Sequence, residues 1–388
     1  MLPCLLFVVA VLYNGRKTVQ DGLFGESMKL NELRDELSSL DRRLLELVAE
    51  RQRIVGEIGR NKLTTGRATR DYGREKVVIE TARDYAKTLS LDPKLAEDIV
   101  RSLIRASLAT QERDRVAAGG KGNGRSVLVI GGAGKMGGWF VDFFASQGYS
   151  TSIADRRATG HDRSFRDWKE SGVEHDVIVV ATPLAMSGSI LLQLAEARPR
   201  GLVFDIGSLK TPLRAGLERL IDVGCNVTSV HPMFGPDTEL LSGRHLIFVD
   251  VGRPEATAQA KELFASTMVQ QLDMGLEDHD RLIAYVLGLS HALNIAFFTA
   301  LAESGEAAPK LARLSSTTFD AQLLVSAAVA RDNPHLYFEI QNLNKFGLGP
   351  LDALCESVNR IRKLVAEGDE AGFVDMMKRG REYLATRR

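Results

Sequence analysis

The sequence predicts a multidomain protein, with an all-α module followed by an α/β domain and a second all-α domain. The length of 388 residues suits two or three domains. Apolar residues follow helical spacing before residue 125, and short apolar runs alternate with helical segments after it. We expect these parts: an extension over 1–27, a helical module over 28–116, a Gly-rich flexible linker over 117–124, an α/β domain over 125–275 and a helical domain over 276–388.

The overall composition is that of a soluble globular protein, with 44% apolar and 26% charged residues. Fifty Lys and Arg residues balance fifty Asp and Glu residues, so the formal net charge is zero. This balance excludes a generally basic nucleic-acid binder and a strongly acidic disordered chain. Any anionic ligand must therefore be held by a few locally placed cations.

Three cysteines, Cys4, Cys225 and Cys355, lie far apart and form no CxxC or Cys/His cluster. This pattern predicts neither a disulfide framework nor a metal site, and it favours a reducing, cytoplasmic location. The apolar run Leu2–Tyr13 precedes its basic residues instead of following them, which is unlike a signal peptide. No run reaches the roughly 18 apolar residues that span a bilayer. We expect no membrane association and a functional start at Met28, with a weak N-terminal anchor as the alternative.

The helical module begins with one long helix that carries a narrow apolar seam. Its apolar residues are spaced alternately three and four apart: Leu30, Leu33, Leu37, Leu40, Leu44, Leu47, Ile54 and Ile58. Arg51 takes the skipped position of the seam, and Lys62 lies near the same face. Arg34 points about 100° away from Arg51, so it would more easily reach a partner protomer.

Two further helices are predicted at about 71–88 and 94–116. On the second of them Ser107 and Gln111 are four residues apart and continue an apolar face. Polar groups that extend an apolar stripe indicate a lined pocket.

The α/β domain is predicted to contain a doubly wound parallel sheet. The expected strands are short and apolar: Ser126–Ile130, Thr151–Ala154, Val177–Ala181, Leu202–Ile206, Val227–Val230, Leu246–Asp250 and Val269–Leu272. From about Leu276 the chain is expected to be helical again, beginning with a long apolar helix over 277–303.

A dinucleotide-binding Rossmann domain is indicated by the loop after the first strand. Its glycines allow a tight turn and a close approach to a pyrophosphate at the helix N-terminus. Asp155 comes 18 residues after Gly137, where an acid would accept hydrogen bonds from a ribose. The expected cofactor-binding residues are Gly132, Gly134, Met136, Gly137, Asp155 and Thr182.

The predicted cofactor is NAD, because the Asp155 carboxylate would repel the 2′-phosphate of NADP. Arg156 and Arg157 directly follow Asp155 and could offset that repulsion, so NADP stays the alternative.

Dehydrogenation of an alcohol needs a base for the hydroxyl proton, and His is suited because its pKa lies near neutrality. His231 ends a predicted strand and precedes a Pro/Gly-rich loop, which places it at the ligand-binding edge of the sheet. Ser208 follows another strand and could orient the imidazole or the substrate hydroxyl. Four other histidines lack such a setting: His161, His175, His245 and His335.

These residues resemble prephenate dehydrogenases over most of 125–345. The resemblance is carried by GGAGKMG, DIGSLK and the specific motif HPMFGPD, and continues through Glu277–Asp280, Ser290-His291 and Asn333–Tyr337. It implies NAD-linked oxidative decarboxylation of prephenate to 4-hydroxyphenylpyruvate. By the same resemblance His231 accepts the hydroxyl proton, Ser208 hydrogen-bonds within the cluster, and His291 lines the substrate pocket.

One position departs from that family. Related bacterial enzymes grip a prephenate carboxylate with an arginine, whereas Asp320 stands at the matching place here. Arg331, Arg313 or Lys345 could supply the cation, and no spacing argument selects one. An aspartate could instead favour the amino group of arogenate, so arogenate stays an alternative substrate.

The first module resembles the small all-helical chorismate mutases over nearly all of 28–116. The resemblance implies an intertwined homodimer in which Arg34 enters the partner's site. It also implies that Arg51 holds a chorismate carboxylate and that Lys62 and Gln111 bind the ether oxygen. The ring hydroxyl region is met by Glu75 and Asp71, and Arg74 and Ser107 complete the pocket.

The two resemblances describe consecutive steps, because the product of the mutase is the substrate of the dehydrogenase. We therefore predict a bifunctional chorismate mutase–prephenate dehydrogenase of tyrosine biosynthesis. The pericyclic rearrangement needs cations placed against developing charge and requires no metal. The alternatives are an arogenate dehydrogenase with a fused mutase, and a non-catalytic sensor of NAD and an aromatic metabolite.

Overall fold

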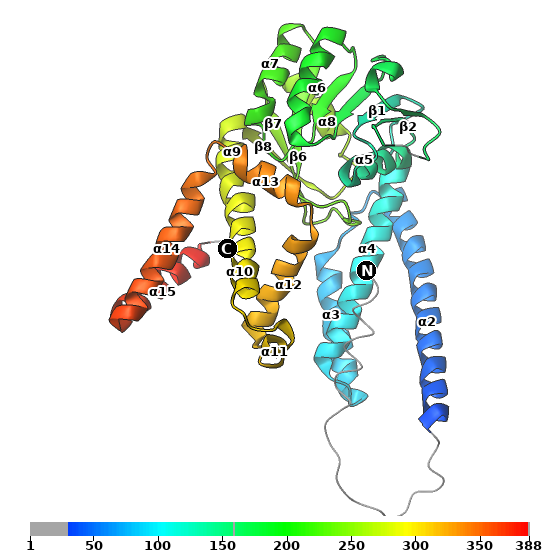
Figure 1. The fold of residues 1–388 in the computed structure, drawn as a ribbon. Coiled ribbons are helices and arrows are strands. Elements are labelled where there is room, and N and C mark those ends of the chain that lie inside the picture. Colours follow the sequence, from blue (N-terminus) through cyan, green and yellow to red (C-terminus); the bar gives the residue numbers. More distant parts are fainter. Residues whose placement is uncertain (1–29, 158–159, 387–388) are drawn as a thin grey trace, which may run out of the picture. The chain divides into compact units, whose positions relative to one another are not determined.

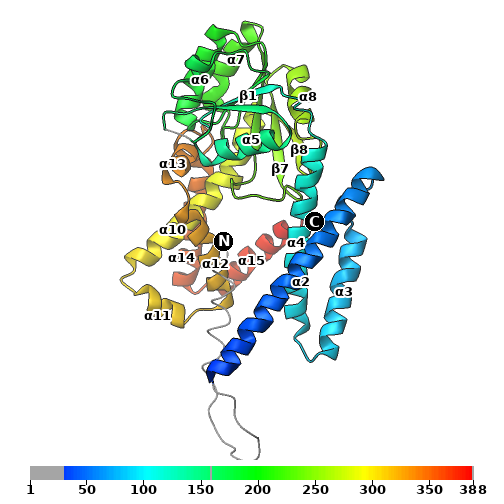
Figure 2. The same ribbon diagram turned by 90° about the vertical axis from the view of Figure 1, so that its right-hand side faces the viewer.

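A computed structural model describes residues 30–157 and 160–386. The extension expected over 1–27, with Cys4, lies outside the described residues. The chain divides into two compact units between Ile58 and Gly59. Figures 1 and 2 show the elements of both units, and each unit is described by itself below.

The first unit consists of most of helix α2 (Leu30–Thr64), which continues across the boundary as one helix of 35 residues. The long predicted helix is therefore confirmed. Its apolar seam is largely exposed: Leu33, Leu37 and Leu44 keep 49%, 55% and 55% of their surface accessible. An exposed apolar seam of this length is typical of a helix face that packs against another surface.

The helical part of the second unit contains α3 (Tyr72–Thr88) and α4 (Pro93–Ala118), which run side by side (Figure 2). Asp71 caps α3 by accepting a hydrogen bond from the Arg74 amide, and Asp92 caps α4 ahead of Pro93 at its first position. Both predicted helices are confirmed.

The Gly-rich segment after α4 is held against the chain, so the expectation of a flexible linker is wrong. The Gly122 amide donates to the Gln147 carbonyl oxygen at 3.0 Å, and the Gly124 amide donates to the Gly148 carbonyl oxygen at 3.1 Å. A Cβ atom on Gly122 would lie 2.3 Å from the Gly148 carbonyl carbon. Glycine occurs here because two backbones approach closely.

The α/β part contains an eight-stranded sheet in the order β3-β2-β1-β4-β5-β6-β7-β8. The strands are β1 (Ser126–Ile130), β2 (Ser150–Ala154), β3 (Ser164–Phe165), β4 (Val177–Val180), β5 (Leu202–Asp205), β6 (Asn226–Pro232), β7 (His245–Asp250) and β8 (Gln270–Gly275). All neighbours pair in parallel except β6 and β7, which are antiparallel. The predicted parallel sheet is therefore confirmed from β1 to β6, and is corrected at β7 and β8, which run antiparallel to those strands. The two-residue β3 is too short to show a periodic pattern.

Helices cover both faces of this sheet (Figures 1 and 2). One face packs against α5 (Lys135–Ser146) and α8 (Pro254–Glu262), and the other against α6 (Leu184–Ala197) and α7 (Arg214–Asp222). Two 3₁₀ turns, η1 (Trp168–Ser171) and η2 (Thr211–Leu213), complete the domain. Val127 and Val129 of β1 join the first core and Leu128 and Ile130 the second. A strand buried on both faces reads as one apolar run.

The C-terminal part is helical, as predicted. It begins with α9 (Leu276–Ile283), the π-helix η3 (Ala284–Leu289) and α10 (Ser290–Glu303), which follow one another without a break. The remaining helices are α11 (Ala308–Arg313), α12 (Thr317–Arg331), α13 (Pro334–Asn342), α14 (Leu348–Glu367) and α15 (Glu370–Ala385). Figure 1 shows α12 beside α10 and α13 beneath the sheet.

The helical stretch Leu276–Glu303 is long and apolar enough to span a bilayer, with a mean hydropathy of 1.6 over its most apolar window. This corrects the expectation that no segment qualifies, because an average tolerates the few polar residues that interrupt an apolar run. Length and composition are weak evidence here, since core helices of soluble proteins pass the same test. His279 and Asp280, near its start, are fully buried.

Candidate functional site

The loop between β1 and α5 has the shape of a phosphate cradle. Gly131 adopts a positive φ of 89°, and the Gly134 amide donates to the Gly131 carbonyl oxygen at 3.0 Å. A Cβ atom on Gly137 would lie 2.2 Å from that same oxygen. A Cβ atom on Gly132 would lie 2.8 Å from Ile153. These glycines let the start of α5 pack closely on the sheet, and among the described residues no side chain caps the helix at Gly134, as at a helix N-terminus that binds an anion.

Asp155 lies at the carboxyl end of β2, beside this cradle. Its carboxylate accepts hydrogen bonds from the Ala133 amide at 3.2 Å and from the Arg157 amide at 3.0 Å, and it also pairs with the Arg157 guanidinium. Burial acts to raise the pKa of Asp155, but the hydrogen bonds from Arg157 and Ala133 outweigh it and lower the pKa. Asp155 is therefore an ionised acceptor at the edge of the cradle.

The other two predicted cofactor residues occupy different surroundings. Thr182 follows β4, and its hydroxyl lies 2.9 Å from that of Ser187 in α6. Met136 is partly buried and packs against the apolar core.

His231, in β6, takes part in a buried chain of hydrogen bonds. Its Nδ1 atom lies 2.9 Å from Nε2 of His279, and Nδ1 of His279 lies 2.7 Å from Oδ1 of Asp280. His231 is 3% exposed and the other two residues are fully buried. The sequence analysis identified His231 alone as the base and missed the two residues that orient it.

Backbone amides determine the direction of this chain. Asp280 accepts hydrogen bonds from the Lys210 amide at 2.9 Å and the Thr211 amide at 2.7 Å, so its carboxylate is held as an acceptor. His279 must then donate from Nδ1, which leaves its Nε2 as the acceptor for Nδ1–H of His231. The lone pair of His231 is consequently on Nε2.

Burial favours the neutral form of His231. Burial lowers its pKa well below the usual 6.5, and the electrostatic interactions with His279 and with the Lys210 ammonium lower it further. Lys210 is fully buried and pairs with Asp205 at 2.7 Å, while donating to the Val230 carbonyl oxygen at 2.8 Å. A neutral imidazole with a free Nε2 lone pair is able to accept a proton.

Ser208 follows β5, the parallel neighbour of the strand that carries His231. It is half-buried, and its hydroxyl makes no side-chain hydrogen bond within the described ranges 30–157 and 160–386. The imidazole of His231 is oriented on its Nδ1 side by His279 instead.

His291 lies in the first turn of α10, directly after the π-helix. Its ring stacks on Tyr337 with centroids 4.0 Å apart. Its Nδ1 atom is buried without a hydrogen-bond partner in the described part of the chain, and burial lowers its pKa. A π-turn next to an unsatisfied polar group is common at binding sites.

The structure does not single out a cation that replaces the arginine expected at the position of Asp320. Asp320 is exposed in the first turn of α12 and accepts a hydrogen bond from the Ser315 hydroxyl. Of the three candidate cations, Lys345 pairs with Glu277 at 2.9 Å, and Arg313 and Arg331 are exposed.

The predicted mutase residues are divided between the two units. Arg34 is exposed and Arg51 is half-buried in the first unit, and burial lowers the pKa of Arg51. In the second unit Lys62 donates to the Thr69 carbonyl oxygen at 2.7 Å. Asp71 serves as the cap of α3, and Arg74 is exposed in the first turn of that helix.

Glu75 is held by the neighbouring Arg70, to which the sequence assigned no role. Both of its carboxylate oxygens accept hydrogen bonds from Arg70, at 2.9 and 3.1 Å. The same guanidinium also donates to the Ser242 hydroxyl at 3.0 Å.

Ser107 and Gln111 are buried on α4, with 5% and 7% of their surfaces exposed. The Ser107 hydroxyl donates to the Leu103 carbonyl oxygen. The Oε1 atom of Gln111 is buried and lacks a hydrogen-bond partner among the residues that the structure describes. A Cβ atom on Gly59 would lie 3.0 Å from Gln111 Cγ, so the end of α2 that belongs to the second unit passes closely beside this side chain.

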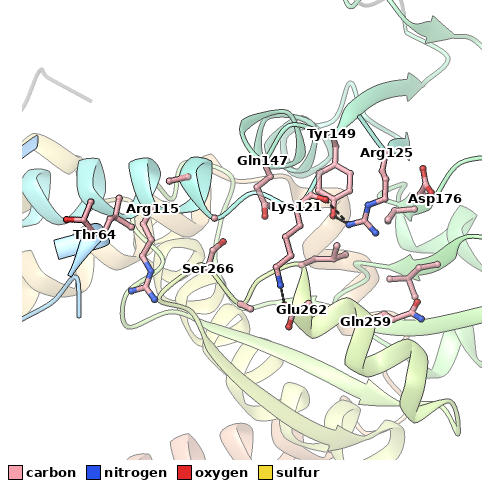
Figure 3. A pocket seen from close by; sticks show the side chains of 17 residues that line it. Thr64, Arg115, Lys121, Arg125, Gln147, Tyr149, Asp176, Gln259, Glu262 and Ser266 are labelled. Atoms are coloured by element: carbon pink, nitrogen blue, oxygen red, sulfur yellow. Dashed lines mark hydrogen bonds and ion pairs between the residues drawn. The ribbon is translucent and has the colours of Figure 1, made fainter. Parts of the chain in front are cut away.

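A separate pocket of 680 Å³ lies where α4 and the Gly-rich segment meet the amino ends of β4 and β5 (Figure 3). Arg125 donates to the Tyr149 hydroxyl on its wall, and Lys121 pairs with Glu262. None of the predicted site residues lines this pocket.

Three family models match the chain. A type II chorismate mutase model matches residues 33–112, the nucleotide-binding domain of prephenate dehydrogenase matches 154–271, and its dimerization domain matches 276–379. The Gly132–Gly137 loop lies just outside these ranges, so its assignment depends on its own geometry.

Two relatives match this chain over nearly its whole length and over nearly their own. The T-protein of Enterobacter agglomerans is 26% identical over 359 residues, covering 92% of this chain and 93% of that protein. The T-protein of Haemophilus influenzae is 24% identical over 359 residues, covering 91% and 92%. A prephenate dehydrogenase structure from A. aeolicus, in complex with hydroxyphenyl propionate and NAD+, shares the fold. Its TM-score is 0.54 and its identity 19%, and the match covers 68% of this chain and 98% of that one.

Proposed function

Because this chain belongs to the enzymes that join a type II chorismate mutase to a prephenate dehydrogenase, we propose that the residues described above carry these two reactions. The protein rearranges chorismate to prephenate and then oxidatively decarboxylates prephenate to 4-hydroxyphenylpyruvate, in tyrosine biosynthesis. The observation that carries the dehydrogenase half is the buried chain from Asp280 through His279 to His231.

The residues of the cradle fit a dinucleotide. Gly137 allows the start of α5 to pack against the Gly131 carbonyl, and no described side chain caps that helix at Gly134, so its backbone amides can bind a pyrophosphate. Gly132 and Gly134 line the turn, the Asp155 carboxylate accepts from the ribose hydroxyls, and Met136 and Thr182 border the same edge. Bound NAD supplies the acceptor for the substrate hydride.

His231 accepts the proton of the substrate hydroxyl at Nε2. Asp280 and His279 hold the imidazole in the tautomer that leaves this nitrogen unprotonated. Ser208, beyond the neighbouring strand, and His291 on α10 position the substrate. Loss of CO₂ restores an aromatic ring, so the enzyme mainly orients the hydride and removes one proton.

The mutase half uses binding groups and no base. Arg51 holds a carboxylate, Lys62 and Gln111 meet the ether oxygen, and Glu75 meets the ring hydroxyl. Arg34, Asp71, Arg74 and Ser107 complete the pocket. The unsatisfied Oε1 atom and deep burial of Gln111 support a polar pocket on α4.

The protein forms a cytoplasmic homodimer, with domains over 28–116, 125–275 and 276–388. The dimerization-domain match and the exposed apolar residues of its last two helices support self-association. Those residues include Val358, Ile361, Val365 and Met377. The exposed seam of α2 supports a second contact between protomers, through which Arg34 reaches the partner's site.

The direct test supplies the purified full-length protein with chorismate and NAD, and measures NADH and 4-hydroxyphenylpyruvate. Parallel reactions with prephenate and arogenate compare the two dehydrogenase substrates, and we expect prephenate to be preferred. Absence of NADH with both substrates would overturn the dehydrogenase half.

Two reciprocal variants test the separation of the sites. We expect Arg51→Ala to abolish mutase turnover while dehydrogenase activity on added prephenate persists, and His231→Asn to do the reverse. Arg43→Ala, an exposed arginine of the same helix, is the matched control for Arg51. If Arg51→Ala removed both activities, the modular assignment would be contradicted.

A further inference from the structure

Two adjacent residues of the loop between β6 and β7 contact the mutase module, one at helix α4 and the other at Arg70, just before α3. The Leu241 amide donates to Oε2 of Glu112 at 2.7 Å. The other carboxylate oxygen of Glu112 accepts from the Met268 amide at 2.6 Å. Glu112 is only 3% exposed, and it directly follows Gln111 on α4. This buried carboxylate therefore fixes the loop at Leu241, and the segment before β8 at Met268, against α4.

The next residue of the loop, Ser242, holds Arg70. The Arg70 guanidinium donates to the Ser242 hydroxyl at 3.0 Å and to both oxygens of Glu75. Its carbon also lies 4.4 Å from the centre of the Tyr72 ring. Three partners thus restrain a side chain that otherwise samples many rotamers.

We propose that Ser242, supplied by the nucleotide-binding domain, completes the mutase site by positioning Arg70 and, through it, the carboxylate of Glu75. Arg70 and Ser242 are positioning residues, and Glu112 anchors the loop that presents Ser242. This inference rests on the proposed mutase function, in which Glu75 meets the ring hydroxyl of chorismate.

The hydrogen bond from the Arg70 guanidinium to the Ser242 hydroxyl links Arg70 directly to the loop between β6 and β7. Arg70 and Glu75 are five residues apart, so without Ser242 both can move together with the start of α3. With Ser242 in place the pair is tied to a segment that Glu112 already fixes. A bidentate pair held on a third side keeps one orientation, which a substrate hydroxyl can then recognise.

The side chains of Arg70 and Glu75 are partly buried, at 29% and 18% exposure. The hydrogen bond to Glu75 raises the pKa of Arg70, which agrees with a persistent ion pair. Partial burial limits the screening that weakens exposed ion pairs.

The experiment uses full-length protein carrying Ser242→Ala, Ser242→Thr or the control Ser357→Ala. Ser357 is an exposed serine on α14 whose hydroxyl donates within its own helix. Mutase activity is followed as loss of chorismate without NAD, and dehydrogenase activity as NADH formed from added prephenate.

We expect Ser242→Ala to raise the chorismate KM about three- to tenfold, with kcat within about twofold, since one hydrogen bond that orients a binding group is lost. Ser242→Thr, which keeps the hydroxyl, restores the wild-type KM. Dehydrogenase activity on prephenate stays within about twofold, because the hydrogen-bond chain of His231 is untouched.

A double-mutant cycle separates positioning from general packing. Arg70→Ala alone should raise the chorismate KM more than Ser242→Ala, and adding Ser242→Ala to it should change nothing further. Additive effects of the two substitutions would overturn the proposal. So would equal losses of both activities, which indicate a general structural role.

An active wild type with unchanged kinetics for Ser242→Ala would overturn this inference alone. A wild type that turns over no chorismate would overturn the proposed mutase function and this inference with it. The two failures are therefore distinguishable.

Discussion

The Nδ1 atom of His231 lies 2.9 Å from the Nε2 atom of His279, 48 residues further along the chain. His231 is in β6 and His279 is in α9, so this contact joins the sheet to the first C-terminal helix. Asp280 accepts hydrogen bonds from Nδ1 of His279 and from the backbone amides of Lys210 and Thr211. The tautomer of the proposed base is thus determined across a domain boundary.

Replacing Asp280 by Asn should therefore inactivate the dehydrogenase. An amide can present a donor to His279, which reverses the chain of hydrogen bonds and places the proton on His231 Nε2. We expect kcat with prephenate to fall about 100-fold or more, with mutase turnover retained. Asp278→Asn is the matched control, since that exposed aspartate lies on the same helix and pairs with Arg281. Full dehydrogenase activity in Asp280→Asn would refute the tautomer argument.

The dehydrogenase should stay active below the usual pKa of histidine. Burial, with smaller contributions from His279 and the Lys210 ammonium, lowers the pKa of His231 well below 6.5, so the base stays neutral down to lower pH. The acid limb of kcat/KM for prephenate, measured from pH 5 to 8, should accordingly lie below about 6.5.

Lys210→Gln tests the cause of that shift. Removing a positive charge stabilises the imidazolium, so the pKa of His231 rises and the acid limb moves to higher pH. The unpaired Asp205 should also cost about 3–5 kcal/mol of stability. A thermal melt confirms that the variant is folded at the assay temperature. An unmoved acid limb in folded protein would contradict the electrostatic explanation.

Substitution by alanine should have different effects on NAD binding at two adjacent glycines of α5, Gly137 and Gly138. In Gly137→Ala the new Cβ atom would lie 2.2 Å from a backbone oxygen, so the cradle must deform and NAD affinity should fall at least about tenfold. In Gly138→Ala the nearest atom outside the helix is 3.7 Å away, and stability should change little or rise by about 0.5–1 kcal/mol. NAD titration calorimetry and thermal melts compare the two variants. Equal affinities would show that the cradle does not bind the cofactor.

Cofactor choice should depend on Asp155 and Arg157 together. Asp155→Ala removes the charge that repels a 2′-phosphate. It also releases Arg157, which pairs with the Asp155 carboxylate in the wild-type protein. We expect the ratio of kcat/KM for NADP over NAD to rise about 10- to 100-fold. The double variant with Arg157→Ala should lose most of that gain. A gain that persists without Arg157 would show that repulsion by Asp155 acts alone.

Local patterns predicted most of the elements. The strand–glycine–helix unit from Ser126 to Gly137 is correct because its turn, its helix start and its burial depend on adjacent residues. The seam of α2 was readable for the same reason, since helical spacing repeats along one segment. The Gly-rich segment misled because composition does not distinguish glycines that permit motion from glycines that permit close packing.

The sequence by itself determined the three kinds of domain, the cradle, Asp155 and His231, because each is specified by residues next to one another. Only the tertiary structure decided that His279 and Asp280 orient the base, that β7 runs antiparallel to β6, and that Ser242 meets Arg70. Those contacts join residues 48 or more positions apart or depend on the return path of a loop. Periodicity carries no information about such pairings, because they arise when separate elements pack together.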